Sequence, residues 1–254
     1  MQLRRIFALV LSFALPILYA IAHWANILST QLAATMFILF TGSCAILAFT
    51  IVKRAGANGR LGLLHVGMFT GILLIFLGAV AAGIYAIIFR VVTPFPSVAD
   101  ALNFLGYAFA VLGGFQFLWY FRSAFSQWRF RLIPLLGMLV AGPNLILSHP
   151  TIAVHPFVIA DATWLAYPIL DGVLVTLAIM MVLLFSGGII SASWRWVAIG
   201  LILITVADTI VGAGNSLGWR QFVQPFYLFY FWGYICLGLG FSLMPSLERL
   251  QPFD

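Results

Sequence analysis

Two aspartates lie inside long hydrophobic stretches, where a carboxylate is costly to keep. Asp171 and Asp208 are two of only six acidic residues in a chain of 254 residues. In hydrocarbon, a carboxylate costs a few kcal/mol unless it is paired, protonated or hydrated, so acids at such depth commonly bind ligands or carry protons. The alternative is a hydrogen-bonded Asp that holds neighbouring helices together. The two positions therefore predict either a polar functional site or a polar contact between helices.

Other polar side chains lie at a similar depth in the neighbouring hydrophobic stretches. Asn103 and Tyr107 follow Asp100 at i+3 and i+7, which places the three on one side of a helix. Tyr167 stands four residues before Asp171 and shares its helix face. The candidate ligand-binding residues are Asp100, Asn103, Tyr107, Asn144, Tyr167, Asp171, Asp208, Tyr230 and Tyr234.

Asp100 also has a simpler interpretation, as a residue that starts a helix. It belongs to the Pro-rich stretch Thr93–Tyr107, in which Ser97 can cap the helix that follows. An Asp in the first helical turn accepts hydrogen bonds from free backbone N–H groups and complements the helix dipole. The same interpretation applies to Asp161, so both aspartates are candidates for a purely structural role.

The chain is far too apolar for a soluble domain. Hydrophobic residues make up 64% of it and charged residues 7%, whereas a soluble globular domain carries roughly 25% charged residues. Because such a chain cannot build a hydrated surface, its solvent must be lipid. No segment is long or polar enough for a separate soluble domain, so residues 1–254 are predicted to be a single integral membrane domain. The predicted fold is an all-α polytopic membrane helix bundle.

Eight hydrophobic runs approach the length of about 20 residues that spans a bilayer. We expect loops between them, including residues 149–164, which carry two prolines, and residues 212–224. The first run is too long for the core of a signal peptide and is interpreted as an uncleaved helix. The eight predicted transmembrane helices cover approximately residues 6–28, 32–52, 61–88, 99–121, 132–147, 165–185, 194–211 and 225–244.

The basic residues predict the orientation of these helices. With a cytoplasmic N-terminus, ten of the twelve basic residues fall on the cytoplasmic side, and only Arg90 and Arg220 fall outside. Cytoplasmic loops carry such an excess of Lys and Arg, so the pattern favours eight crossings with both termini cytoplasmic. The polar candidates then lie in the outer half of the membrane, and the inner half is nearly apolar. This asymmetry favours an outward-facing pocket over a conducting path, which needs polar groups at every depth.

A short pattern recurs where the chain enters the membrane from outside. The segment Ala99–Tyr107 (ADALNFLGY) aligns with Ala160–Tyr167 (ADATWLAY), with matching Ala, Asp, Ala, Leu and Tyr. A third segment, Trp232–Tyr234 (WGY), is similar to Leu105–Tyr107 (LGY). The pattern predicts tandem helical hairpins that pair the third helix with the fourth, the fifth with the sixth and the seventh with the eighth.

Several other chemistries find no support in the sequence. Cys44 and Cys236 lie in hydrophobic runs without a CxxC or Cys/His neighbour, and we expect both to be buried small side chains. The HExxH, GxSxG, P-loop and GxGxxG fingerprints are absent. The only lysine, Lys53, falls in a predicted cytoplasmic loop, which excludes a retinal Schiff base in the last helices.

Haem and nucleic acid are both disfavoured as partners. A haem between two helices needs a facing pair of histidines at matched depth; His23 and His149 both fall near the outer surface, whereas His65 falls at the opposite side. The basic residues are scattered over loops rather than gathered into a patch for nucleic acid. We therefore expect no cofactor, no metal and no nucleic acid; the expected partners are the lipid bilayer, a small-molecule or lipid ligand and a cytoplasmic signalling protein.

A set of short motifs resembles one known class of membrane region. It resembles the multi-pass N-terminal membrane sensor regions of prokaryotic histidine kinases and diguanylate cyclases, over approximately residues 94–246. In that class, the last helix leads into cytoplasmic output domains; this sequence departs from it by ending at Asp254 without a kinase, cyclase or PAS domain. The motifs that carry the likeness are Pro96–Asp100 with Tyr107, Tyr167–Asp171, Ala207–Asp208 and Trp232–Tyr234.

The resemblance implies a sensing or ligand-binding module whose signal passes to a separate cytoplasmic partner. The leading hypothesis is therefore a sensor in the cell membrane with an outward-facing polar pocket, which shifts a helix when its ligand binds. One alternative is a membrane enzyme or proton-coupled transporter that uses Asp171 and Asp208 as acid and base. Another is a structural subunit of a membrane complex, in which the polar cluster only joins helices.

Overall fold

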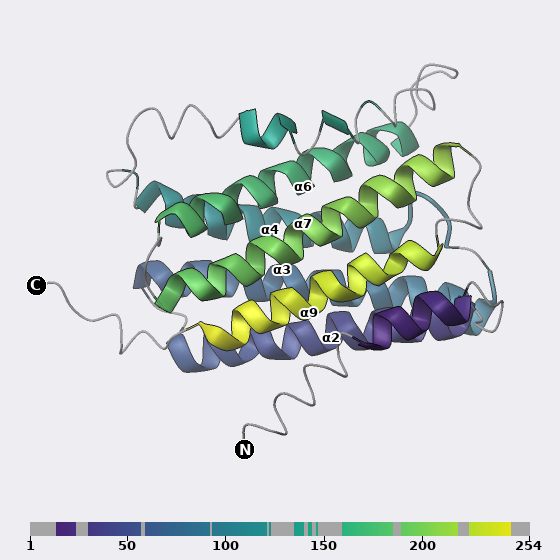
Figure 1. The fold of residues 1–254 in the computed structure, drawn as a ribbon, viewed down its shortest axis with the longest axis horizontal. Coiled ribbons are helices and arrows are strands. Elements are labelled where there is room, and N and C mark those ends of the chain that lie inside the picture. Colours follow the sequence, from purple (N-terminus) through teal and green to yellow (C-terminus); the bar gives the residue numbers. More distant parts are fainter. Residues whose placement is uncertain are drawn as a thin grey trace, which may run out of the picture.

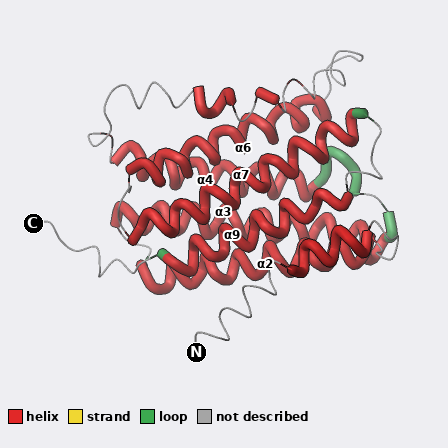
Figure 2. Tube along the Cα trace, viewed as in Figure 1, coloured by secondary structure: helices red, strands yellow, loops and turns green. Residues whose placement is uncertain are grey.

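The computed structural model describes the chain within residues 14–23, 30–56, 59–91, 93–120, 122, 135–139, 142–143, 146, 159–184, 189–217 and 224–244. Its long elements are helices α2 (Thr30–Ala55), α3 (Gly59–Ile84), α4 (Val98–Tyr120), α6 (Ile159–Leu184), α7 (Ile189–Ser216) and α9 (Leu228–Leu243). A π-helical turn, η1 (Tyr85–Phe89), extends α3, and a 3₁₀ turn, η3 (Gln224–Tyr227), leads into α9. Helices account for nearly all of this part of the chain, and it contains no strand (Figure 2).

Six helices of the described part are long and apolar enough to cross a membrane. They match the second, third, fourth, sixth, seventh and eighth predicted spans, which confirms an all-helical architecture of the multi-pass membrane type. The first predicted span is described only as the helical segment Ala14–His23. The fifth, over residues 132–147, is described only in short helical pieces. The rest of these two predicted spans lies outside the described residues.

The six long helices form a ring. Their extensive contacts join α2 to α3, α3 to α4, α4 to α6, α6 to α7, α7 to α9, and α9 back to α2. Figure 1 shows the helices running across the view in similar directions, with α6 uppermost and α2 at the bottom. The segment Ala14–His23 packs against α9, where the rings of Tyr19 and Phe231 meet edge to face with centroids 4.9 Å apart.

Glycines bring two pairs of helices into contact along their backbones. Between α3 and α4, a Cβ atom on Gly71 would lie 2.8 Å from the carbonyl oxygen of Gly106. Between α7 and α9, a Cβ atom on Gly200 would lie 2.7 Å from the carbonyl oxygen of Gly233. Small residues permit this approach in membrane helices, whose association depends on close packing rather than on the hydrophobic effect. These two hairpins also share the most extensive contacts in the ring.

The outside of the ring is apolar, and basic side chains gather at one of its ends. Leu112 on α4, for example, exposes 64% of its surface, which suits contact with lipid tails. Lys53 and Arg54 lie in the last turn of α2. Arg122 follows the end of α4, and Arg195 lies in the second turn of α7. These residues share the end of the ring at which α2 and α4 finish and α7 begins.

The helix α6 starts earlier than the sequence pattern predicts. Residues 159–164 belong to its first turns, so the predicted loop over residues 149–164 is wrong in its last third. The two prolines that suggest a loop, Pro150 and Pro156, both precede Ile159, and a proline restricts only its own position and the residue before it. Ala160 and Ala162 favour a helix, and no proline lies between Pro156 and Pro168, so the sequence from Ile159 onward permits the helix to form.

The helix α7 also extends further than predicted, through Gly212 and Gly214 to Ser216. Glycine is tolerated in a membrane helix because the backbone has no water to bond to in place of the helical hydrogen bonds. Asp208 therefore lies about 12 Å from the end of α7, and Asp171 lies about 18 Å from the start of α6, at 1.5 Å per residue. Both aspartates therefore lie deeper in their helices than the predicted spans over residues 165–185 and 194–211 place them.

The cysteines confirm their predicted role. Cys44 on α2 and Cys236 on α9 are both free, and each is 1% exposed. They pack in the core as small apolar side chains.

Candidate functional site

The start of α4 is fixed by a reciprocal pair of side chain–backbone hydrogen bonds. The Ser97 hydroxyl accepts from the backbone N–H of Ala99 at 3.2 Å, and Asp100 Oδ2 accepts from the backbone N–H of Ser97 at 2.7 Å. The Ser97 hydroxyl also donates to Asp100 Oδ2 at 2.9 Å. This is a capping box, which satisfies helix N–H groups that have no partner within the helix. The predicted structural role of Asp100 is therefore confirmed.

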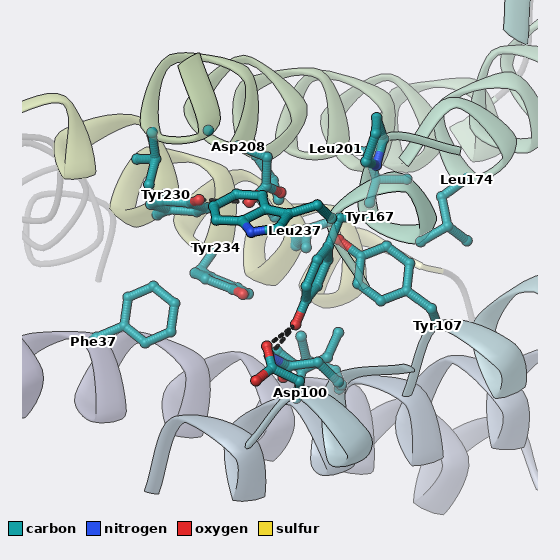
Figure 3. A pocket seen from close by; sticks show the side chains of 18 of the residues that line it. Phe37, Asp100, Tyr107, Tyr167, Leu174, Leu201, Asp208, Tyr230, Tyr234 and Leu237 are labelled. Atoms are coloured by element: carbon teal, nitrogen blue, oxygen red, sulfur yellow. Dashed lines mark hydrogen bonds between the residues drawn. The ribbon is translucent and has the colours of Figure 1, made fainter. Parts of the chain in front are cut away.

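The second oxygen of Asp100 reaches across to the next helix of the ring. The Tyr167 hydroxyl on α6 donates to Asp100 Oδ1 at 2.8 Å, as the dashed line in Figure 3 shows. Asn103 Nδ2, one turn further along α4, donates to the same hydroxyl oxygen at 3.4 Å. Asn103 packs over Gly78 of α3, where an added Cβ atom would come within 2.5 Å of its Oδ1. Asp100 thus caps α4 through Oδ2 and contacts α6 through Oδ1.

A second link between α4 and α6 lies deeper in the ring. The Tyr107 hydroxyl donates to Asp171 Oδ1 at 2.5 Å, and Tyr107 and Asp171 are only 7% and 2% exposed. Asp171 Oδ2 is buried and has no hydrogen-bond partner within 3.5 Å among the described residues. An unpaired polar oxygen at this depth is costly. Tyr107 therefore holds Oδ1 of Asp171, and the other group that interacts with this carboxyl is Asp208 of α7.

Asp208 forms the matching link between α7 and α9. The Tyr230 hydroxyl donates to Asp208 Oδ1 at 2.5 Å. The carboxyl groups of Asp208 and Asp171 lie near enough to interact with each other, so α6 and α7 are coupled through two acids. Two neighbouring carboxylates in a low-dielectric interior repel each other unless a proton or a cation lies between them.

These side chains surround a cavity of about 280 Å³ at the centre of the ring. Figure 3 shows Asp100 and Phe37 approaching it from one side and Asp208 and Tyr230 from the other. The cavity lies in the half of the ring where α2, α4, α6 and α9 begin and α7 ends, at the opposite end from Lys53, Arg54, Arg122 and Arg195. Its lining includes Phe37, Phe95, Asp100, Asn103, Tyr107, Trp164, Tyr167, Pro168, Asp208, Tyr230 and Tyr234, with apolar side chains from α3, α6, α7 and α9 below them.

The structure brings most of the predicted site residues together. Seven of them line the cavity directly: Asp100, Asn103, Tyr107, Tyr167, Asp208, Tyr230 and Tyr234. Asp171 lies behind this lining and meets it through Tyr107 and Asp208. Tyr234 is 6% exposed, and its ring meets that of Phe37 edge to face with centroids 5.6 Å apart. Asn144 lies outside the described residues.

Several lining residues were not predicted from the sequence. Phe37 comes from α2, a helix that carries no acid, and nothing in its sequence indicates which face points inward. Trp164 falls in the stretch predicted to be a loop, and Phe95 precedes the capping box; their rings lie 4.8 Å apart at the mouth of the pocket. Trp164 lies within the repeated segment Ala160–Tyr167, and the alignment of this segment with the start of the fourth predicted helix is the signal that could have found it.

The lining is rich in hydrogen-bond acceptors and aromatic rings and carries no Lys, Arg or His among the described residues that form it. The described part of the chain contains no group of three His, Cys, Asp or Glu side chains placed to hold a metal ion. The arrangement can accept hydrogen bonds, stabilise a positive charge or hold a proton between two carboxyl groups. No protein-family model, curated protein or solved structure matches the chain.

Proposed function

We propose that this protein is a membrane-embedded sensor, which binds a small ligand in the central cavity and passes a helix movement to a cytoplasmic partner. The observation that carries the proposal is the cavity itself, about 280 Å³ in volume and enclosed by polar side chains from four different helices. Small-molecule sites are typically concave, mostly apolar and furnished with a few convergent polar groups. A polar cluster that served only to join helices would pack without such a space.

Three polar links make α6 the helix most directly coupled to the cavity. Tyr167 and Asp171 connect it to α4, and Asp171 connects it to Asp208 of α7. The pairs α3–α4 and α7–α9 are held by glycine contacts along their backbones, whereas α6 makes less extensive contacts with either neighbour. A ligand that competes for these hydroxyl or carboxyl groups would therefore shift α6 against two rigid hairpins.

The proposal includes eight crossings of the cell membrane with both termini in the cytoplasm. The clustering of Lys53, Arg54, Arg122 and Arg195 at the end of the ring opposite the cavity supports this orientation. The cavity then faces outward. The motif resemblance to the membrane sensor regions of histidine kinases and diguanylate cyclases supports the signalling role, and the partner would be a cytoplasmic protein with such an output.

The proposal also includes an internal repeat, in which the α7–α9 hairpin is a second copy of the α3–α4 hairpin. Gly71 and Gly106 meet as Gly200 and Gly233 do, and both α4 and α9 continue with Tyr, as Tyr107 and Tyr234. Two helical turns further along, the contact recurs in both hairpins. A Cβ atom on Gly113 would lie 3.3 Å from the carbonyl oxygen of Leu64, and a Cβ atom on Gly240 would lie 2.9 Å from the carbonyl oxygen of Ser193. The spacing along each helix is the same in the two hairpins. These matched contacts support the predicted third–fourth and seventh–eighth repeats.

A second candidate function is a proton-coupled transporter or enzyme that uses the pair Asp171 and Asp208. The proximity of the two acids and the unpartnered Asp171 Oδ2 among the described residues favour it. Below the pair, however, the neighbouring cavity is lined almost entirely by apolar side chains. A transport path needs polar groups or water through the full depth of the membrane. The sensor is therefore the better-supported function.

The cavity's role is tested by native mass spectrometry of the full chain purified in detergent micelles. Leu201→Trp would fill the cavity from α7, because Leu201 lines it. Leu112→Trp is the matched control, since that side chain is on the outer surface of α4. We expect a bound small molecule or lipid on the wild type and on L112W, and its loss from L201W. Equal bound mass on all three proteins, or none on the wild type, would overturn the proposed site.

The helix movement is tested by placing spin labels at the far ends of α6 and α9. Leu183 and Ser242 are exposed, and the native cysteines are buried, so Leu183→Cys and Ser242→Cys would label selectively. We expect the distance between the labels to change when the bound molecule is removed, and to stay constant in the L201W background. An unchanged distance in the wild type would argue against a sensor and leave a passive binding protein.

A further inference from the structure

The charge of the cavity lining limits what it can bind. Asp100 and Asp208 line it, Asp171 interacts with Asp208, and none of the described lining residues is basic. An anionic ligand would meet carboxyl groups without a compensating cation, in surroundings where unpaired charges are strongly penalised. A cationic ligand would relieve the repulsion between Asp171 and Asp208. The cavity is therefore unsuited to ligands with a net negative charge, such as free phosphate, sulfate or a simple carboxylate.

The hydrogen-bonding groups point to the same class of ligand. The hydroxyl protons of Tyr107, Tyr167 and Tyr230 are already donated to aspartates, so their oxygens offer lone pairs to any further partner. Pro168 in α6 has no N–H and cannot donate to the carbonyl oxygen of Trp164, another residue of the lining. The lining thus has a surplus of acceptors, which a ligand with several N–H donors or a diffuse positive charge would satisfy.

Aromatic rings complete the recognition of a cation. Phe37 and Trp164 approach the cavity from α2 and α6, and Tyr107, Tyr230 and Tyr234 contribute rings from α4 and α9. A cation over the face of such rings gains about 0.5–2 kcal/mol for each favourable contact, most with Trp. Carboxyl groups combined with aromatic walls are the surroundings in which ammonium groups are typically bound.

An adjoining apolar chamber gives the ligand a second, hydrocarbon part. A neighbouring cavity of about 80 Å³ lies deeper in the ring and is lined by apolar side chains such as Met68, Leu177 and Met181. It shares Ile72, Leu174 and Leu201 with the central cavity, so the two spaces adjoin. A chain or ring of a few carbon atoms would fill it. The combined space therefore has a polar, acceptor-rich end and an apolar end.

We propose that the cavity binds an amphiphilic organic cation, an amine or quaternary ammonium group attached to a hydrocarbon chain. The ammonium group lies among Asp100, Asp208 and the aromatic rings, and the chain extends past Leu201 into the apolar chamber. This inference rests on the proposed function, since it names the ligand class of the same cavity. Two sources carry this chemistry: a free amine and the headgroup of a zwitterionic lipid.

The inference is tested by calorimetric titration of the full chain in an uncharged maltoside detergent. The probes are hexylamine, hexyltrimethylammonium, hexanol and hexyl sulfate, which differ in the polar group and share the chain. We expect the two cations to bind at least about tenfold more tightly than hexanol, a difference of ~1.4 kcal/mol, and hexyl sulfate not to bind. Ethylamine should bind more weakly than hexylamine, because it cannot reach the apolar chamber.

Two variants separate recognition by charge from a general loss of structure. Asp208→Asn should weaken binding of both cations by about tenfold or more while leaving hexanol binding unchanged. Thr209→Val is the matched control on the next residue of α7, because the Thr209 hydroxyl, within the described part of the chain, donates to the carbonyl oxygen of Thr205. Leu201→Trp should abolish binding of all the probes, although it retains every carboxyl group. Equal binding of cations to D208N and wild type would overturn the inference.

The remaining outcomes distinguish this inference from the proposed function. If hexanol or hexyl sulfate binds best and L201W abolishes that binding, the cavity is a ligand site and only the cationic class is wrong. If no probe binds and the purified protein carries no bound molecule, both proposals fail. Adding phosphatidylethanolamine to the micelles, with phosphatidylglycerol as the control lipid, identifies the source: competition with hexylamine by the first lipid alone indicates a headgroup, and its absence indicates a free amine.

Discussion

The two glycine contacts lead to a stability prediction that treats the hairpins as equivalent. Gly71→Ala and Gly200→Ala each add a Cβ atom that would lie 2.8 Å and 2.7 Å from a backbone carbonyl oxygen of the facing helix. Because the obstructing atom belongs to the backbone, the helices must separate rather than rotate a side chain. Overpacking of this kind costs about 1–3 kcal/mol, against which alanine gains up to ~1 kcal/mol in helix propensity over glycine.

Gly142→Ala supplies the control for the propensity gain alone. A Cβ atom at Gly142 would meet nothing within 4 Å among the described residues. We expect G142A to be neutral or stabilising, and G71A and G200A to be destabilised by similar amounts. The measurement is thermal unfolding of the purified protein in detergent, where each kcal/mol corresponds to ~2–4 °C for a chain of this size. If G71A and G200A unfold at the same temperature as G142A, the close approach of the helices is refuted.

Further predictions concern single contacts of the site and the core. Tyr107→Phe removes the hydrogen bond that the Tyr107 hydroxyl donates to Asp171, and should destabilise the protein by about 1–3 kcal/mol in chemical or thermal unfolding; a Tyr107→Phe/Asp171→Ala cycle with additive effects would contradict this. Ser97→Ala removes the cap of α4 and should lower the free energy of unfolding by ~1 kcal/mol. An unchanged free energy of unfolding would show that the capping box does not form. Cys44 and Cys236 are buried, so a maleimide should label them only after unfolding; rapid labelling of the folded protein would show that the core is open.

The sequence predicts the helices better than their arrangement. The ends of α3 and α4 match the prediction closely, because Gly59, Arg90 and Ser97 mark where long apolar runs stop. The start of α6 and the end of α7 do not match, since a proline or glycine near a membrane boundary does not by itself end a helix. The order of helices around the ring depends on contacts between distant segments, which no periodicity within one segment records.

The site is predictable where depth and charge are informative. Asp171 and Asp208 stand out because an acid within an apolar run needs a partner, and Tyr107 stands out because it shares a helix face with Asp100. Phe37, which forms part of the cavity wall, could not be found from depth or charge. The chain has 24 Phe and 8 Trp residues, so an aromatic side chain alone does not distinguish the interior of the ring from its lipid-facing surface.

The single proline in the described part of α6 gives this helix a mechanical property of its own. Pro168 falls between Tyr167 and Asp171, the two residues that tie α6 to α4. About 16 residues, or ~24 Å of helix, separate it from the end of α6 at Leu184. A bend of only ~5° at the missing backbone hydrogen bond would displace that end by ~2 Å. A small bend at Pro168 would therefore move the far end of α6, at Leu184, more than the turns beside the cavity.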